Sequence, residues 1–120
     1  MENTGGKNEL ERRTLAFVIA VVRFVSSLPR GEVTSVIGRQ LLRSATSLGA
    51  NYREANRAES RDDFIHKTAI AQKEATETNY WLEICRQSNI GEVIQVVSHA
   101  TEARELLAIL TTINRKAKGR

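Results

Sequence analysis

Apolar residues recur along most of the chain in alternating steps of three and four, which is the spacing of one face of an α-helix. The first such stretch predicts a helix over about Asn8–Leu28. Pro29 ends it, because the residue that precedes a proline is pushed out of the helical region. A short connection over 29–31 then leads into a second predicted helix, over about Glu32–Ala58.

The C-terminal half of the chain predicts two further helices. The third starts at Arg61, directly after Ser60, which suits the N-cap position, and ends before the turn at 88–91. The fourth runs over about Glu92–Lys116. No run of Val, Ile and Thr alternates with a period of two, so no strand is predicted. The chain therefore reads as an all-α protein.

Four helices joined by short connections predict a single antiparallel up-and-down four-helix bundle over residues 1–120. The two ends, 1–7 and 117–120, are expected to be flexible. The small residues Gly38 and Gly49 are expected to let two helices approach closely. The predicted core consists of the stripe positions Leu10, Thr14, Phe17, Val21, Phe24, Leu28, Ile37, Leu41, Ser44, Leu48, Asn51, Ala55, Phe64, Thr68, Ala71, Ala75, Thr78, Leu82, Cys85, Val93, Val96, Ala100, Ala103, Leu107, Leu110 and Asn114.

Composition narrows the class of protein. With 41% apolar and 27% charged residues, the chain is an ordinary globular domain rather than a disordered segment. The single cysteine, Cys85, excludes an intramolecular disulfide. The N-terminus lacks the apolar stretch of a signal peptide, and the longest apolar run, 15–22, is too short to span a bilayer. We therefore expect a bacterial-type cytoplasmic protein with no membrane contact.

The net charge of +4 is unevenly distributed along the chain. Segment 37–61 carries five arginines against two glutamates, segment 62–102 has more acids than bases, and segment 104–120 has five bases against one glutamate. Such segregation produces a field that an anionic partner can sense, although solvated helix faces are the alternative.

Basic residues on the second helix and at the C-terminus are candidates for binding RNA or DNA, because arginine offers a fork of donors to phosphate. No aromatic residue except Tyr52 lies near the arginines, so stacking of single-stranded bases is poorly supported. A protein partner is the alternative. The candidates are Arg39, Arg43, Arg53, Arg57, Arg115, Lys116, Lys118 and Arg120.

A row of polar residues runs beside the apolar stripe of the second helix. We interpret it as a network that fixes the register of the helices or a subunit contact, with a ligand site as the alternative. Glu54 and Arg57 are close enough to pair, and Arg53 or Arg57 can reach Asp62 or Asp63 across the turn. The members of the network are Gln40, Arg43, Ser47, Asn51, Glu54, Arg57 and Asp63.

The residue types of catalytic and metal sites do not occur together in the sequence. His66 and His99 are far apart, no Glu-x-x-His is present, and no glycine-rich phosphate loop is found. Cys85 lies on the apolar seam of the third helix, where an inert thiol is expected. We therefore predict no catalytic residue, no metal and no cofactor.

The fourth helix has an unusually wide apolar face, because Leu106, Ile109 and Ile113 lie beside its stripe. Together with Tyr80 and Trp81, which lie off the seam of the third helix, this face indicates contact with a second subunit. Coverage of that face by the other helices of the same chain is the alternative.

The segment Gln40–Ala55 reads QLLRSATSLGANYREA and resembles a family of four-helix bundle proteins encoded in intervening sequences of bacterial 23S rRNA. The family's glycine after the glutamate is Ala55 here, and its Gly-Ser pair in the third helix is Gln72-Lys73. The matching residues are Gln40, Arg43, Ser47, Asn51, Glu54, Arg57, Ser60, Asp63 and Phe64.

The resemblance implies an up-and-down bundle that assembles into a pentameric ring. It also connects the chain to the accessory protein of diversity-generating retroelements, a basic bundle that binds nucleic acid and a reverse transcriptase. A homo-oligomer, a pentamer by resemblance, and an RNA or DNA partner are therefore expected.

Overall fold

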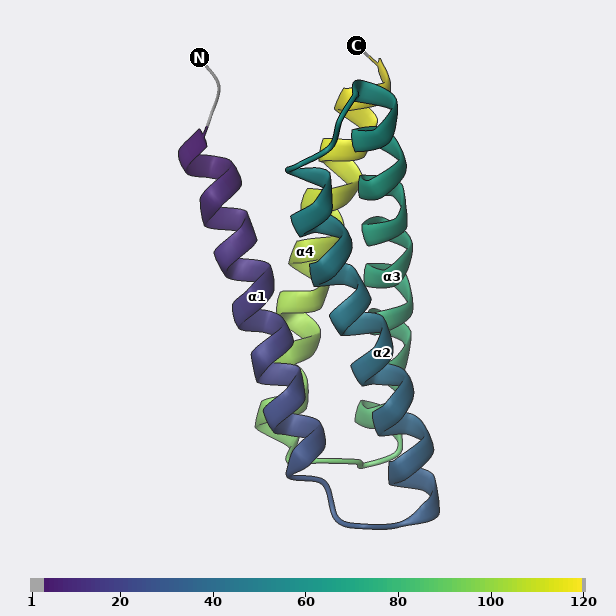
Figure 1. Cartoon of the computed structure of the whole chain (residues 1–120). Helices are drawn as coiled ribbons and strands as arrows, with labels where there is room; N and C mark the ends of the chain where they lie inside the picture. Colours follow the sequence, from purple (N-terminus) through teal and green to yellow (C-terminus); the bar gives the residue numbers. More distant parts are fainter. Residues whose placement is uncertain (1–3, 120) are drawn as a thin grey trace.

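The computed structural model describes residues 4–119 and folds them into four α-helices, without any strand in this range. The helices run alternately up and down (Figure 1). Loops 27–31 and 88–92 lie at one end of the bundle, and the turn 56–60 lies at the other end with the start of α1 and the end of α4. The predicted all-α, antiparallel four-helix bundle is confirmed. The helices are α1 (Thr4–Ser26), α2 (Glu32–Ala55), α3 (Arg61–Gln87) and α4 (Val93–Gly119).

Several helix ends differ from the predicted bounds, and α1 ends at Ser26 rather than Leu28. Residues 4–7 and 117–119, expected to be flexible ends, continue α1 and α4 as helix. The helix α2 stops at Ala55 rather than Ala58, because the backbone tightens there: Arg57 N donates to Glu54 O at 2.9 Å and Ala58 N to Ala55 O at 3.1 Å. Residues 1–3 and 120 lie outside the described residues.

Helix α2 packs between α1 and α3, and α4 packs against α3 and α1. The α2–α3 and α3–α4 pairs make the most extensive contacts, whereas α1 and α4 touch over a much smaller area. Figure 1 shows the reason, since the N-terminal half of α1 leans away from α4. Three helices therefore form a tight unit, and α1 is attached to it mainly along α2.

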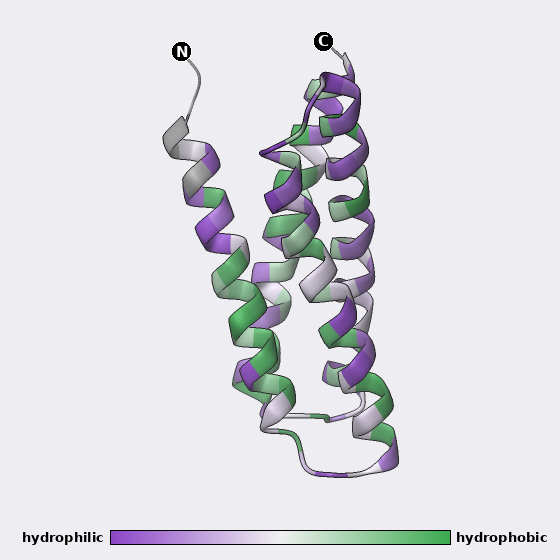
Figure 2. Cartoon of the chain, viewed as in Figure 1, coloured by the Kyte–Doolittle hydropathy of each residue, from purple (hydrophilic) through white to green (hydrophobic). Residues whose placement is uncertain are grey.

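The predicted apolar stripes supply most of the core. Figure 2 shows hydrophobic and hydrophilic residues side by side on each helix. One position on α4 was predicted wrongly. Val93 is 65% exposed, because it is the first residue of the helix at the end of the bundle. Leu107 packs against the core and is partly buried, and its neighbour Leu106 is fully buried. The bulk of the core comes from Phe17, Val21, Phe24, Leu41, Leu48, Tyr52, Leu82, Val96, Leu106 and Leu110.

Buried polar side chains tie α3 to both of its neighbours. Thr78 Oγ1 donates to Ser44 Oγ of α2 at 2.9 Å, with both side chains fully buried. On the other side, Asn114 Nδ2 of α4 donates to Thr68 Oγ1 at 2.9 Å and to the carbonyl of Ile65 at 3.0 Å. Since a slip of either helix would break these bonds between helices and leave the Asn114 amide without its partners on α3, the bonds favour the observed register of the bundle.

Two glycines permit close approaches that a side chain would block. A Cβ on Gly49 of α2 would lie 2.8 Å from Val18 Cγ2 of α1, which confirms the predicted close contact of helices at this residue. Gly91, in the loop before α4, has φ of +89°, and a Cβ there would lie 2.5 Å from the ring of Phe24.

None of the helices in residues 4–119 combines the length and the apolar character needed to cross a lipid bilayer.

Core leucines should dominate the stability of the bundle. Leu48 and Leu82 have no exposed surface, so Leu48→Ala and Leu82→Ala should each lower the free energy of unfolding by about 2–5 kcal/mol in urea denaturation. Val33→Ala is the control, because Val33 of α2 is 64% exposed and its truncation should change stability by less than about 0.5 kcal/mol. Equal unfolding midpoints for all three variants would contradict this assignment of the core.

Candidate nucleic-acid interface

Arg39, Arg43 and Arg53 are exposed on the side of α2 opposite the buried residues Leu41 and Leu48, and Arg57 is exposed in the turn that follows this helix. The i,i+4 spacing within each pair places Arg39 beside Arg43 and Arg53 beside Arg57, as predicted. The side chains of Arg43, Arg53 and Arg57 keep 47%, 60% and 58% of their surface exposed. These four arginines, which we call the arginine row, are distributed along the outer side of α2 and the turn that follows it.

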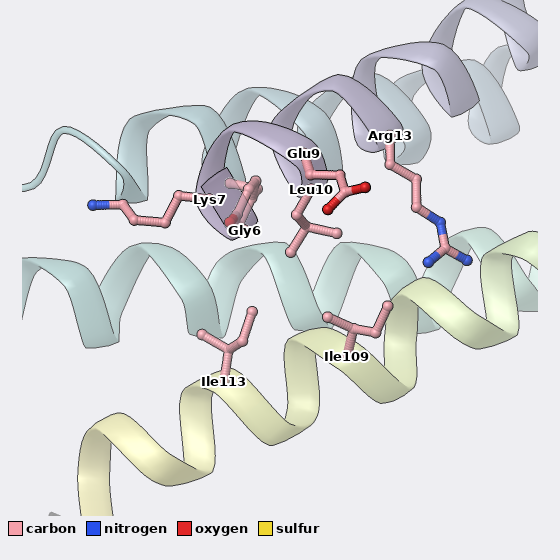
Figure 3. A pocket seen from close by; sticks show the side chains of 8 residues that line it. Gly6, Lys7, Glu9, Leu10, Arg13, Ile109 and Ile113 are labelled. Atoms are coloured by element: carbon pink, nitrogen blue, oxygen red, sulfur yellow. The ribbon is translucent and has the colours of Figure 1, made fainter. Parts of the chain in front are cut away.

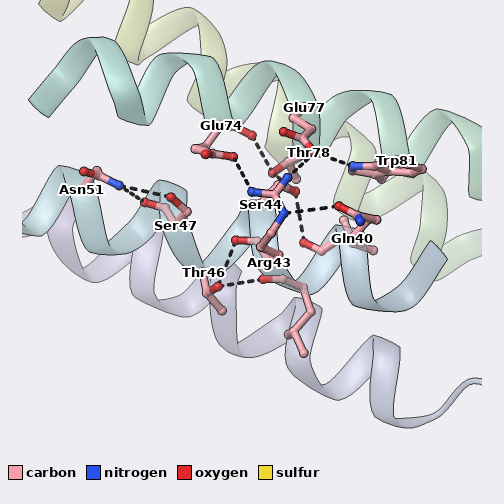
Figure 4. A network of polar contacts seen from close by, with 12 residues as sticks. Gln40, Arg43, Ser44, Thr46, Ser47, Asn51, Glu74, Glu77, Thr78 and Trp81 are labelled. Carbon is pink, nitrogen blue, oxygen red and sulfur yellow. Dashed lines mark hydrogen bonds and ion pairs between the residues drawn. The ribbon is translucent and has the colours of Figure 1, made fainter. Parts of the chain in front are cut away.

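Arg43 reaches from the arginine row onto α3 (Figure 4). Its Nη1 lies 3.4 Å from Glu74 Oε1, its Nη2 is paired with Glu77, and its Nε donates to Gln40 Oε1 at 3.2 Å. Trp81 Nε1 donates to the same Glu77 carboxylate at 3.0 Å. The hydrogen bonds from Arg43 and then from Trp81 lower the pKa of Glu77, so this pair stays charged well into the acid range.

Arg53 and Arg57 bind Glu11, a carboxylate on α1. Arg57 donates through Nη1 to Glu11 Oε1 at 3.1 Å and through Nη2 to Oε2 at 3.2 Å. Arg53 Nη1 lies 3.3 Å from Oε2, and Asn56 Nδ2 donates to Oε1 at 3.0 Å. These bonds, that of Arg57 first and that of Asn56 next, lower the pKa of Glu11.

The two arginines do not make the pairs expected across the turn. Glu54 accepts from Lys67 Nζ of α3 at 2.7 Å rather than from Arg57. Neither Arg53 nor Arg57 contacts Asp62 or Asp63. The reason is geometric, because α2 ends three residues early and turns Arg57 toward α1.

Arg39 differs from the other three arginines. Its Nη2 donates to Ser35 Oγ at 3.1 Å, and no carboxylate pairs with it among the described residues. Its charge is therefore the least compensated in the arginine row.

The polar row does not form one connected network among the described residues: hydrogen bonds join Gln40 to Arg43 and Ser47 to Asn51, but none joins these two pairs to each other or to Glu54. Between Gln40 and Glu54 it lies along the α2–α3 contact, where Asn51 Nδ2 donates to Ser47 O at 2.9 Å and to Ser47 Oγ at 3.1 Å (Figure 4). Arg57 faces α1 instead, as described above. These side chains bond within the bundle, and the structure does not join Arg57 to the others.

Asp63 belongs to the cap of α3. Its backbone N–H donates to Ser60 Oγ at 3.0 Å, and its Oδ2 accepts from Glu59 N at 3.2 Å. The predicted N-cap at Ser60 is confirmed, and the reciprocal bonds form a close relative of a capping box.

The basic end of the chain lies beside the α2–α3 turn. Arg61, at the start of α3, donates through Nε and Nη2 to the carbonyl of Ala117 at 3.0 and 2.6 Å. Arg115, Lys116 and Lys118 are exposed on the last turns of α4. Figure 1 shows this end next to the C-terminal end of α2, so the tail and Arg57 gather at one end of the bundle. Arg120 lies outside the described residues.

Glu11 and Arg13 are functional candidates that the sequence did not reveal. Arg13 of α1 donates to Glu102 of α4 through Nε at 2.6 Å and Nη2 at 2.8 Å, and its Nη2 also lies 2.6 Å from Glu105 Oε1. The bond with Glu102 is the main reason that the pKa of Arg13 is raised. Charged residues near the start of an amphipathic helix are the only signal in the sequence, and they do not identify partners so far along the chain.

A cleft of about 530 Å³ opens where α1 leans away from α4 (Figure 3). Leu10, Ile109 and Ile113 form its apolar walls, with Lys7 and Glu9 at the rim. The wide apolar face of α4 is therefore directed partly at α1 of the same chain. Trp81 packs against the core, whereas Tyr80 remains 60% exposed.

Apolar side chains are also exposed on two other surfaces. On α1 they form a stripe at i,i+4,i+7 spacing, and on α4 they gather at its N-terminal end. Their burial by another molecule would be favourable. The residues are Leu15, Ile19 and Val22 on α1, and Val93, Ile94 and Val97 on α4.

Within residues 4–119 no group of three or more His, Cys, Asp or Glu side chains is arranged to hold a metal ion. Cys85 is buried, and burial raises the pKa of its thiol. His99 packs edge-to-face on Phe24 with ring centroids 5.3 Å apart, and burial lowers its pKa.

Comparison with known proteins agrees with this architecture. The profile of a family described as 23S rRNA-intervening sequence protein matches residues 7–112. A crystal structure from Bacteroides thetaiotaomicron VPI-5482, of a protein of unknown function from the S23 ribosomal protein family, is 38% identical with a TM-score of 0.80. The match covers 88% of this chain and 97% of that chain. No curated protein matches significantly. The chain belongs to the family of 23S rRNA-intervening sequence proteins.

Proposed function

We propose that this protein is a non-catalytic, oligomeric bundle of the bacterial cytoplasm that binds RNA or DNA with little sequence preference. The observation that carries the proposal is the arginine row on the outer side of α2, which leads toward the basic end of α4. Guanidinium groups at helical spacing suit a phosphate backbone, since each offers several donors and keeps its charge.

Recognition would involve phosphates rather than bases. Tyr52, the aromatic residue nearest to the arginines in sequence, is only 2% exposed and forms part of the core. It offers no ring for stacking, so base contacts of the kind that single-strand binding proteins use are not expected here. The interaction should therefore be electrostatic and strongly dependent on salt.

A single subunit should bind weakly, because three of the four arginines are already paired with carboxylates. Repetition of the arginine row around an oligomer would compensate by avidity. The exposed apolar stripe of α1 and the apolar N-terminal end of α4 support assembly of copies through unlike surfaces. If the last copy contacts the first through the same two surfaces, the assembly is a closed ring. The resemblance to the family favours five subunits.

A protein partner is the second candidate, favoured by the same exposed apolar residues. In that case the arginine row would contribute only to the rim of a protein interface. Capture of a partner that is insensitive to nuclease, together with weak retention on heparin, would support it.

The arginine row should account for a measurable share of binding. In fluorescence anisotropy with labelled RNA and DNA, we expect affinity to fall steeply between about 50 and 200 mM salt. Arg39→Ala combined with Arg43→Ala should weaken binding of either nucleic acid and reduce the slope of log K against log salt by about one to two.

Arg86→Ala combined with Arg104→Ala is the matched control, because it removes the same charge from α3 and α4. Its effect should be clearly smaller. Equal losses of affinity in the two double variants would mean that binding depends on the net charge of the protein and not on the arginine row. A lack of binding even at low salt would contradict the proposed function.

The oligomer should depend on the exposed apolar residues. Light scattering at micromolar concentration should give a multiple of the 13.4 kDa subunit mass, which is fivefold for a pentamer. Ile19→Asp or Ile94→Asp should dissociate the assembly while the helical circular dichroism signal is retained, because both side chains are exposed in the subunit. A monomer mass for the unmodified protein would contradict oligomerisation.

A further inference from the structure

We infer that Arg53, Asn56 and Arg57 form a phosphate-binding site that Glu11 closes in the free protein, and that nucleic acid must displace Glu11 to occupy it. The inference rests on the proposed function and adds two features to it, a competitor built into the chain and a conformational change. It concerns the C-terminal half of the arginine row and the N-terminal half of α1.

Arg53, Asn56 and Arg57 surround the Glu11 carboxylate in the way that the donors of an oxyanion-binding site surround a bound anion. The Glu11 carboxylate receives four contacts between 3.0 and 3.3 Å from these three side chains. Its own side chain is only 15% exposed, whereas those of Arg53 and Arg57 are about 60% exposed, at 60% and 58%. A polyanion can therefore approach the guanidinium groups from solvent, but the donors that face inward are already used by Glu11.

A phosphate can replace this carboxylate without loss of hydrogen bonds. Both groups are anionic oxygen acceptors, and arginine binds either of them through paired N–H donors. Asn56 Nδ2 supplies a third donor from the same turn of the chain. The same donors thus make the same kind of hydrogen bond to Glu11 or to a backbone phosphate. A small difference in affinity decides which anion is bound.

Displacement of Glu11 would loosen the N-terminal half of α1. Among the described side chains before Thr14, which is fully buried, Leu10 is the apolar one that packs against the core, and it does so partly. Ion pairs attach this segment through Glu11 to α2 and through Arg13 to α4. The cleft beside Leu10 shows that α1 is already separated from α4 at this point (Figure 3).

The coupling has a thermodynamic consequence. A site that is competent only when Glu11 has left shows an affinity reduced by the fraction of molecules in that state. Removal of the competing carboxylate should therefore strengthen nucleic-acid binding, by about fivefold or more if the coupling is of the usual size. Binding and opening of α1 should also occur together, because the same residues control both.

The test compares Glu11→Gln with Glu9→Gln in anisotropy measurements with one labelled RNA at fixed salt. Both variants remove one negative charge from the first turns of α1, but Glu9 lies at the rim of the cleft (Figure 3), which neither Arg53 nor Arg57 lines, and both arginines pair with Glu11 instead. Glu11→Gln should bind about fivefold or more tightly than the unmodified protein. Glu9→Gln should change affinity less than about twofold, as one distant charge does.

Hydrogen exchange provides the second measurement. Saturating RNA should accelerate amide exchange over residues 9–14 while leaving the middle of α3 unchanged. In an Arg53→Ala, Arg57→Ala background, Glu11→Gln should have no more effect on affinity than Glu9→Gln.

Equal affinities for Glu11→Gln and Glu9→Gln, with RNA still bound, would overturn this inference and leave the proposed function intact. Increased protection of residues 9–14 in the complex would overturn it as well. If neither the unmodified protein nor Glu11→Gln binds RNA at low salt, the proposed function fails and this inference fails with it.

Discussion

The contact between α2 and α3 determines how the rest of the molecule is arranged. At its centre, Ser44 and Thr78 share a hydrogen bond of 2.9 Å inside the core. Small residues around them, Ala45, Ala71 and Ala75, are completely buried and let the helices pack closely. Because this contact fixes which side of α2 faces inward, it also directs the arginines of the opposite side toward solvent.

Helix α1 is attached by a different kind of interaction. From Phe17 onward it contributes large apolar side chains to the core, but its N-terminal half depends on charged side chains. Apolar contacts depend little on salt, whereas partly exposed ion pairs weaken as ionic strength rises. The two halves of one helix should therefore respond differently to the same change of solution, and the boundary between them lies near Thr14.

The spacing of apolar residues along the sequence predicted the helices and most of the core. In a bundle of this size, the buried positions recur with each turn of a helix. This spacing failed at Val93, the first residue of α4, which is exposed at the end of the bundle. It also located the arginines on a common side of α2. It could not predict their partners, since Glu11 and Arg57 are separated by 46 positions and meet only through the topology.

The same limit applies to Arg13 and Glu102, which are 89 positions apart. A charged residue at the edge of an amphipathic stripe can pair with either neighbouring helix or with solvent, and local spacing does not distinguish these outcomes. The resemblance to the family identified residues of the α2 segment, but Glu11 is not among the residues that carried it. The features that control the candidate site therefore required the folded chain.

The bond from Arg61 to the carbonyl of Ala117 has a consequence for the basic end of the chain. It supports helix through Gly119, so Arg115, Lys116 and Lys118 are held at fixed angles around α4 instead of trailing as a flexible arm. A flexible polycation adapts to any arrangement of anions but loses conformational entropy when it does so. A helical one loses little, and in return it discriminates between surfaces by the spacing of their charges. For the proposed nucleic-acid partner, the last turns of α4 would therefore favour phosphates whose spacing matches that of the three cations.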